Sequence, residues 1–202
     1  LLEEGFRVLV LAGTKEKIYD QLNLGAYALG YVVLANPIRE NAKSTFNYFA
    51  EQGVNIKVIS GDNPQTVSAV AKRAGITGAE RFIDANLLKT KEDLDQAVES
   101  YTVFGRVTPD QKRRLVQALK RKDHTVAMTG DGVNDILAMK SADCSIAMAS
   151  GSDAATQVAQ VVLLDSDFGH MTQVVTEGRR VVNNVQRSAI LFLVKKSLKL
   201  SK

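Results

Sequence analysis

Two carboxylates and an amide lie close together in residues 129–143, TGDGVNDILAMKSAD. Asp131 and Asp135 are four residues apart, and Asn134 lies between them. Carboxylate oxygens suit a hard cation such as Mg²⁺, and the N–H groups at the start of a helix attract phosphate. Crowded carboxylates repel each other unless a cation or a base offsets their charge. The stretch therefore predicts a site for Mg²⁺ and phosphate, whereas a lone Gly-Asp pair would favour a plain turn with an aspartate as helix cap.

Two further segments offer partners for such a site. Ser60, Gly61 and Asp62 follow an apolar run and provide a hydroxyl, a close backbone approach and an acid. Lys112 lies one turn into a predicted helix over residues 110–122, from which its charge can reach a phosphate. Taken alone, the first segment is also explained by an ordinary strand-to-helix turn, and the lysine by a solvent-exposed helix position.

The apolar pattern predicts the elements that must position these residues. Apolar runs predict strands at residues 5–12, 27–34, 54–59, 81–83, 101–104, 125–128, 145–149 and 161–164. Helical spacing, caps and breakers predict helices that begin at Pro37 with Asn36 as N-cap, at Pro64, and at residues 91, 110, about 133 and 170. This alternation indicates a parallel α/β sheet with crossover helices. In such sheets ligands bind at the carboxyl ends of the strands, so residues 60–62, 106–112 and 129–135 should share one site.

Composition limits the other classes of function. The chain has 202 residues with 45% hydrophobic and 24% charged content, which is typical of a soluble globular domain. Its single cysteine and two histidines exclude a disulfide framework and a zinc-ligand spacing. No apolar run approaches the roughly 18–20 residues that span a bilayer. The net charge is +4, and no acidic residue follows Glu177. This basic end is compatible with binding to a nucleic acid or to an anionic membrane surface, and also with a role in solubility alone.

Four segments together resemble the motifs of the P-type ATPases, ion pumps of the haloacid dehalogenase-like superfamily. Residues 129–143 resemble the hinge motif of these pumps. Residues 36–39 (NPIR), 60–63 (SGDN) and 104–112 (FGRVTPDQK) resemble their DPxR, TGD and FAR-x-x-P-x-x-K segments, in the family's order. Asn36 and Ser60 stand where the family has Asp and Thr. The resemblance covers nearly the whole chain.

The resemblance implies a role for each matching residue. In the family, ATP phosphorylates an aspartate, and the aspartyl phosphate is later hydrolysed. Mg²⁺ would be bound by Asp131 and Asp135. The catalytic residues would be Lys112, which neutralises the phosphoryl charge, with Asn134 and Asp135, which organise the phosphate and metal site. The remaining positions would bind the phosphoryl group (Ser60 and Gly61) or lie towards the nucleotide (Asp62, Arg39 and Arg106).

The chain departs from the family in one respect, because the Asp-Lys-Thr-Gly segment with the phosphorylated aspartate is absent from its 202 residues. We therefore expect a fragment that comprises the end of a nucleotide-binding domain and hinge (1–34), a phosphorylation domain (35–176) and a stalk helix leading to a membrane segment (177–202). Its fold would be a Rossmann-like, haloacid dehalogenase-like parallel sheet with flanking helices, lacking the strand that carries the nucleophile. We expect no phosphoenzyme from the fragment alone, and self-association through the exposed sheet edges is a hypothesis.

The function implied is that of an ATP-driven cation pump with ATP and Mg²⁺ as cofactors. Its partners would be the nucleotide, actuator and membrane domains of the same pump, with no nucleic acid, and the cation would bind in membrane helices outside this chain. The parent would be a multi-pass protein of the cell membrane, with this segment in the cytoplasm. The alternatives are a soluble phosphatase of the same superfamily and a regulatory module that binds phosphate or nucleotide without chemistry. The basic, stalk-like helix at residues 177–194 favours the pump.

Overall fold

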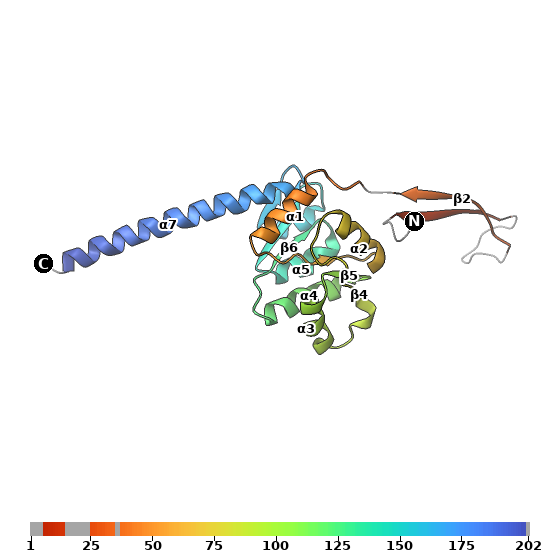
Figure 1. The fold of residues 1–202 in the computed structure, drawn as a ribbon, viewed down its shortest axis with the longest axis horizontal. Coiled ribbons are helices and arrows are strands. Elements are labelled where there is room, and N and C mark those ends of the chain that lie inside the picture. Colours follow the sequence, from red (N-terminus) through yellow and green to blue (C-terminus); the bar gives the residue numbers. More distant parts are fainter. Residues whose placement is uncertain (1–5, 15–24, 35–36, 201–202) are drawn as a thin grey trace.

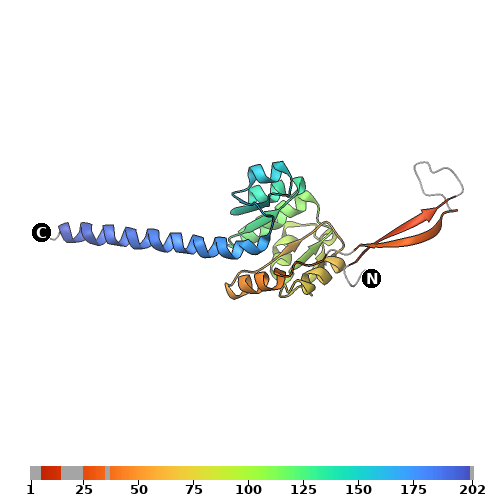
Figure 2. The same cartoon turned by 90° about the horizontal axis from the view of Figure 1, so that it is seen from above.

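The computed structural model describes residues 6–14, 25–34 and 37–200, without the side chains of Arg7 and of residues 194–200. Three parts follow one another along this chain (Figure 1). A β-hairpin extends from one side of a central α/β body, and a long helix extends from the opposite side (Figure 2). The body contains every segment that the sequence places at the site.

The hairpin consists of β1 (Arg7–Gly13) and β2 (Tyr27–Leu34), which pair antiparallel. Both strands were predicted; the predicted start at Gly5 lies outside the described residues. Apolar side chains are exposed on both faces of the hairpin, including Leu29 at 60% and Tyr31 at 68%. A two-stranded ribbon of this kind has little stability of its own, because it needs a further layer to cover its apolar faces.

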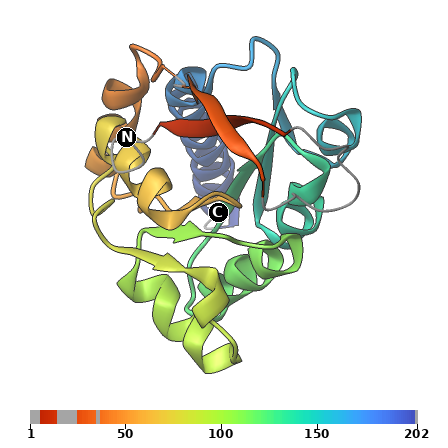
Figure 3. The same ribbon diagram turned by 90° about the vertical axis from the view of Figure 1, so that its right-hand side faces the viewer.

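The central body contains two parallel sheets of three strands each. The first has the order β3-β5-β4 and the second β6-β7-β8. The strands are β3 (Val58–Ile59), β4 (Phe82–Asp84), β5 (Val103–Gly105), β6 (Ala127–Gly130), β7 (Cys144–Met148) and β8 (Val161–Leu163). Figure 3 shows the two groups of strands side by side within the body. Within the described residues no strand pairs with the outer edge of β3 or of β6, so the parallel α/β fold is confirmed but its sheet is divided between these two strands.

Helices connect the strands and cover the sheets. They are α1 (Ala42–Glu51), α2 (Pro64–Arg73), α3 (Lys91–Ser100), α4 (Pro109–Arg121), α5 (Ile136–Ser141), α6 (Asp153–Val158) and α7 (Met171–Leu200), with 3₁₀ turns at Ala85–Leu87, Val133–Asp135 and Phe168–His170. Asn63 caps α2, which has Pro64 at its first position. Thr108 and Gln111 form a capping box at the start of α4. Each cap satisfies backbone N–H groups that the helix itself leaves without acceptors.

The predicted start of a helix at Pro37 is wrong, because α1 begins at Ala42. The preceding residues make tertiary bonds: Arg39 donates to the carbonyl of Ser166, and Asn41 donates to the carboxylate of Asp167. The cap predicted for Asn36 lies outside the described residues. The strand predicted at residues 54–59 is also shorter, since only Val58–Ile59 pairs with β5.

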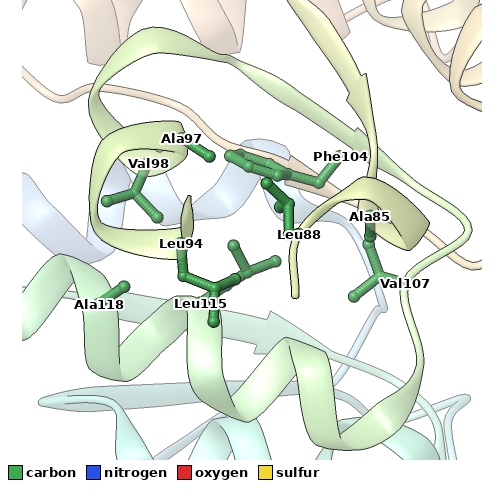
Figure 4. Packing of buried hydrophobic residues seen from close by; sticks show 9 residues of the cluster. All are labelled: Ala85, Leu88, Leu94, Ala97, Val98, Phe104, Val107, Leu115 and Ala118. Atoms are coloured by element: carbon green, nitrogen blue, oxygen red, sulfur yellow. The ribbon is translucent and has the colours of Figure 1, made fainter. Parts of the chain in front are cut away.

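The largest group of buried side chains lies between α3, α4 and β5 (Figure 4). Leu94, Phe104 and Leu115 are almost fully enclosed there, together with Ala85, Leu88, Ala97, Val98, Val107 and Ala118. Because α4 contributes Leu115 to this group, its packing fixes which face of the helix is turned towards the strand ends. Helix α7 begins against α1 and then leaves the body, with exposed apolar residues such as Val185 and Phe192. In the part of the chain that is described, no helix combines the length and apolar character needed to cross a bilayer.

Candidate active site

A cavity of about 520 Å³ lies where the carboxyl ends of β3 and β6 face each other across the divided sheet. Residues from three predicted segments line it: Ile59, Ser60, Gly61, Asp62, Lys112, Met128, Thr129, Gly130, Asp131 and Asp135, together with Met148 of β7. The structure thus brings together Ser60, Gly61, Asp62, Lys112, Asp131 and Asp135. These residues meet because the carboxyl ends of parallel strands lie at one edge of the sheet.

Lys112 and Asp135 form an ion pair at the cavity wall. The Lys112 Nζ lies 2.7 Å from Asp135 Oδ1, and the two side chains are only 14% and 10% exposed. The other carboxylate oxygen, Oδ2, accepts the N–H of Gly132 at 3.3 Å. The repulsion expected between the crowded carboxylates is therefore offset at Asp135 by a lysine and a backbone donor within the chain.

Gly130 allows Asp135 to fold back over the end of β6. A Cβ at position 130 would lie 2.5 Å from the Cβ of Asp135 and 3.0 Å from the sulfur of Met139. Real Cβ atoms essentially never show a contact as short as 2.5 Å, so a residue with a side chain here would displace Asp135. The absence of a side chain at Gly130 thus makes room for Asp135.

Asp131 follows β6 directly and is exposed at the cavity, unlike Asp135. Its backbone carbonyl accepts the N–H of Ser152 at 2.7 Å. Asn134 is also exposed, but it is not among the residues that line the cavity. The proposed role of Asn134 at the phosphate therefore stays a prediction.

The loop after β3 is held by its own hydrogen bonds. The Ser60 hydroxyl accepts the N–H of Asp62 at 3.2 Å, while its backbone carbonyl accepts the N–H of Val107. Gly105, at the end of β5, lies against the next helix, because a Cβ there would be 2.4 Å from the Cα of Pro64. These contacts bind the loop to the end of β5 and leave the Ser60 hydroxyl hydrogen free to turn towards the cavity.

Two arginines predicted to lie towards the nucleotide are paired elsewhere. Arg106 lies 2.6 Å from Asp84, and Arg39 lies near Asp167 and donates to Ser166. The Asn86 N–H and then Arg106 lower the pKa of Asp84 below its ordinary value. The Gly169 N–H, the amide of Asn41 and Arg39 lower the pKa of Asp167. Neither arginine lines the cavity. Asp84 and Asp167 were not singled out from the sequence, because both are distant along the chain from the arginines they bind.

The donors around the cavity fit Mg²⁺ in kind but are few. Carboxylate and backbone oxygens are the ligands that this cation prefers. Asp131 offers an exposed carboxylate, whereas Asp135 is already bound to Lys112. Among the described residues, no group of three or more His, Cys, Asp or Glu lies close enough together to hold a metal. A cation bound here would need further oxygen ligands from water or from another segment.

A comparison with protein families agrees with this fold and this site. The model of haloacid dehalogenase-like hydrolases matches residues 4–143. The chain belongs to this family of hydrolases. The match includes every predicted site residue, from Arg39 to Asp135.

Relatives identify the branch of the family. The chain is 48% identical over 197 residues to the probable cation-transporting ATPase exp7 of Streptococcus pneumoniae, covering 96% of this chain and 25% of that protein. It is 50% identical over 194 residues to the calcium-transporting ATPase CtpE of Mycobacterium bovis, covering 95% of this chain and 24% of that protein. A solved zinc-transporting PIB-type ATPase in its E2·Pi state matches in fold with a TM-score of 0.65 and 23% identity, over 92% of this chain and 24% of that chain.

These matches confirm the resemblance to cation-transporting P-type ATPases, and the family model confirms a haloacid dehalogenase-like hydrolase domain. They also confirm that the chain corresponds to a fragment, because it spans about a quarter of the length of the relatives it matches. The roles of individual residues are matters of proposal, as are the substrates of a whole pump.

Proposed function

We propose that this chain is the part of an ATP-driven cation pump that holds Mg²⁺ and the phosphoryl group during transfer from ATP to an aspartate outside the chain. The observation behind this proposal is the cavity at the ends of β3 and β6, where Ser60, Lys112 and Asp131 meet. Phosphoryl transfer depends mainly on positioning and on neutralising charge. A hydroxyl, a largely enclosed lysine and an exposed carboxylate are suitable groups for both tasks.

Each residue has a proposed part in this reaction. Lys112 would approach the phosphoryl oxygens as a point charge, held in place by Asp135. The Ser60 hydroxyl would donate to one of these oxygens, and Gly61 would let them approach the backbone N–H groups. Asp131 would bind Mg²⁺, which when bound would offset the negative charge of the phosphate. A carboxylate oxygen would attack the terminal phosphorus of ATP, the bond to the bridging oxygen would break, and ADP would leave.

The attacking carboxylate would come from a strand that fills the division in the sheet. The outer edges of β3 and β6 offer backbone N–H and C=O groups on both sides of the division. A parallel strand between them would place its carboxyl end at the cavity, where the other strands end. In this arrangement the carboxylate would also supply an oxygen ligand that the Mg²⁺ site otherwise lacks.

The proposed domains follow the three parts of the structure. The hairpin would belong to the end of a nucleotide-binding domain (1–34), the body to the phosphorylation domain (35–176), and α7 to a stalk (177–202) beside a cell membrane. Two relatives are named as cation- or calcium-transporting, which supports a cation as cargo. A soluble phosphatase would use the same cavity, but the projecting α7 and the relatives favour the pump.

The site can be tested on the chain without a nucleophile. Inorganic phosphate should bind to the wild-type chain only with Mg²⁺, as followed by ³¹P NMR, and Asp131→Ala should abolish this dependence. Lys112→Ala should weaken phosphate binding at least about tenfold, because it removes a charged partner of the phosphate. Lys120→Ala is the matched control, since Lys120 lies on α4 but pairs with Asp143 away from the cavity. Phosphate binding that ignores both Mg²⁺ and Asp131 would show that the metal assignment is wrong.

A further inference from the structure

The turn that follows β7, residues 149–152, packs against the backbone of Asp131. The N–H of Ser152 donates to the Asp131 carbonyl at 2.7 Å. A Cβ at Gly151 would lie 2.5 Å from that carbonyl oxygen and 2.9 Å from the Cα of Asp131. Ordinary van der Waals contacts of a Cβ begin near 3.4 Å. A side chain at position 151 therefore fits only if Asp131 or the turn moves.

The close approach, and not the backbone conformation, requires glycine at this position. Gly151 lies outside the left-handed region that favours glycine. Gly132 differs, because apart from its own chain neighbours a Cβ there would meet nothing nearer than Asp135 Oδ2 at 3.7 Å. Gly151 is thus crowded by a segment that is distant in the sequence, whereas Gly132 is not.

Further hydrogen bonds hold this turn in place, so it cannot easily move away from Asp131. The N–H of Ala149 donates to the carbonyl of Leu163 at 3.0 Å, and the N–H of Gly151 donates to that of Met148 at 2.9 Å. The N–H of Ser150 donates to the hydroxyl of Ser166 at 2.9 Å. A larger residue at position 151 would therefore push mainly on the loop end that holds Asp131.

We propose that Gly151 and Ser152 are positioning residues that hold Asp131 in the place from which its carboxylate binds Mg²⁺. The inference rests on the proposed function, since it assumes a cation at Asp131. Groups that contact and orient a metal ligand affect the affinity for the metal strongly, and their loss typically weakens metal binding by about 10–100-fold. Here the orienting group is a backbone contact from a different strand end, more than a dozen residues away in sequence.

One substitution in the turn and one at a distant helix cap separate positioning from folding. Gly151→Ala should raise the dissociation constant for Mg²⁺ at least about tenfold, measured by ¹H–¹⁵N NMR titration of the whole chain with MgCl₂. Thr90→Ala removes the hydroxyl that caps α3, which is far along the chain from Asp131. It should lower the melting temperature and leave the Mg²⁺ affinity unchanged. Equal weakening by both variants would overturn the proposal.

A third variant tests the same idea without adding bulk near Asp131. Ser166→Gly removes the hydroxyl that accepts the Ser150 N–H, and glycine suits the positive φ of 56° at this position. Loosening the turn in this way should weaken Mg²⁺ binding severalfold and speed amide exchange at Ser152. Unchanged Mg²⁺ affinity in this variant would contradict the inference even if Gly151→Ala failed to fold.

The outcomes distinguish this inference from the proposed function. If the wild-type chain binds Mg²⁺ and Gly151→Ala binds it equally well, the positioning role is wrong and the proposed function stands. If the wild-type chain does not bind Mg²⁺, both are wrong. Faster exchange of the Ser152 amide in Gly151→Ala, measured without metal, would show directly that the contact to Asp131 has loosened.

Discussion

The two carboxylates of the cavity differ in their surroundings, and so in what each can do. Asp135 is buried and bound on both oxygens, to Lys112 and to the Gly132 N–H. Asp131 is exposed, and its backbone carbonyl accepts the N–H of Ser152. A carboxylate with both oxygens engaged orients a neighbour, whereas an exposed one is available to a cation. The sequence pattern treats the two alike, and the structure separates them.

The Lys112–Asp135 pair should contribute to stability as well as to the site. Lys112→Ala leaves a buried carboxylate without its charged partner, which we expect to lower the free energy of unfolding by about 2 kcal/mol. Adding Asp135→Asn should restore part of this loss, because no unpaired charge is then buried. Urea denaturation of the two single variants and the double variant would measure the coupling. Additive losses would show that the pair does not act as a unit.

Asp167 should make the stability of the chain sensitive to acid. The Gly169 N–H, the Asn41 amide and Arg39 lower its pKa in the folded chain. The folded state then binds the proton less readily than the unfolded state. This contribution is present above the unfolded pKa of about 3.9 and is lost as pH falls through the lower folded value.

Asp167→Asn should therefore reduce the urea midpoint at neutral pH and flatten its fall below about pH 4. Glu92→Gln is a suitable control, because Glu92 lies in the first turn of α3, far along the chain from this cluster. If the urea midpoint of Asp167→Asn falls with acid as steeply as that of the wild type, this carboxylate is not a source of the pH dependence.

Helix α4 is the element that delivers Lys112, and two features fix its position. Its capping box sets where the helix begins, and Leu115 anchors one face in the core beside α3. Lys112 is three residues after the first helical residue, so a change in the starting point would rotate it away from the cavity. The cap thus affects both the stability of the body and the geometry of the site.

Two capping boxes of the same design allow a matched test of α4. Thr108→Ala and Thr90→Ala each remove the cap threonine, from α4 and α3 respectively. Each should lower the free energy of unfolding by about 1 kcal/mol. Only Thr108→Ala should also weaken Mg²⁺-dependent phosphate binding, because only α4 bears Lys112. Equal phosphate binding in the two variants would show that the cap does not position the lysine.

The same elements show how far the sequence can predict this molecule. Local signals were sufficient for the helix starts at Pro64 and near residue 110 and for most of the order of strands and helices, since apolar runs, prolines and cap residues act on their own neighbours. The start of α1 was missed because its determinants, Asp167 and Ser166, lie more than a hundred residues away. Helix α6, six residues long, has too short a pattern to predict. The partners of the two arginines and the contact of Gly151 also depend on tertiary approach.

At the scale of the whole molecule, the body holds the buried core and the two extensions hold little of it. The described hairpin residues are half-buried or exposed, and α7 is exposed from Glu177 to Leu193. A chain of residues 37–180 should therefore keep the melting temperature of the full chain within a few degrees, as measured by circular dichroism. It should also retain phosphate binding. A large fall in melting temperature would show that an extension stabilises the body.

Free strand edges and an apolar hairpin should make the full chain associate with itself. Sedimentation velocity over a wide concentration range should show a rising mass for the full chain. If the 37–180 chain associates to the same extent, the edges of β3 and β6 are responsible; if it stays monomeric, the extensions are. A full chain that remains monomeric at every concentration would contradict the hypothesis.

The length of α7 has a mechanical consequence. Thirty helical residues span about 45 Å. The base of this helix follows the loop in which Asp167 binds Asn41, so it adjoins the segment that leads to the hairpin. A tilt of about 5° at the base would move the far end by about 4 Å, because a stiff rod magnifies rotation in proportion to its length. A rearrangement beside Arg39 and Asn41 that tilted the base of α7 would therefore displace its tip by the diameter of an atom or more.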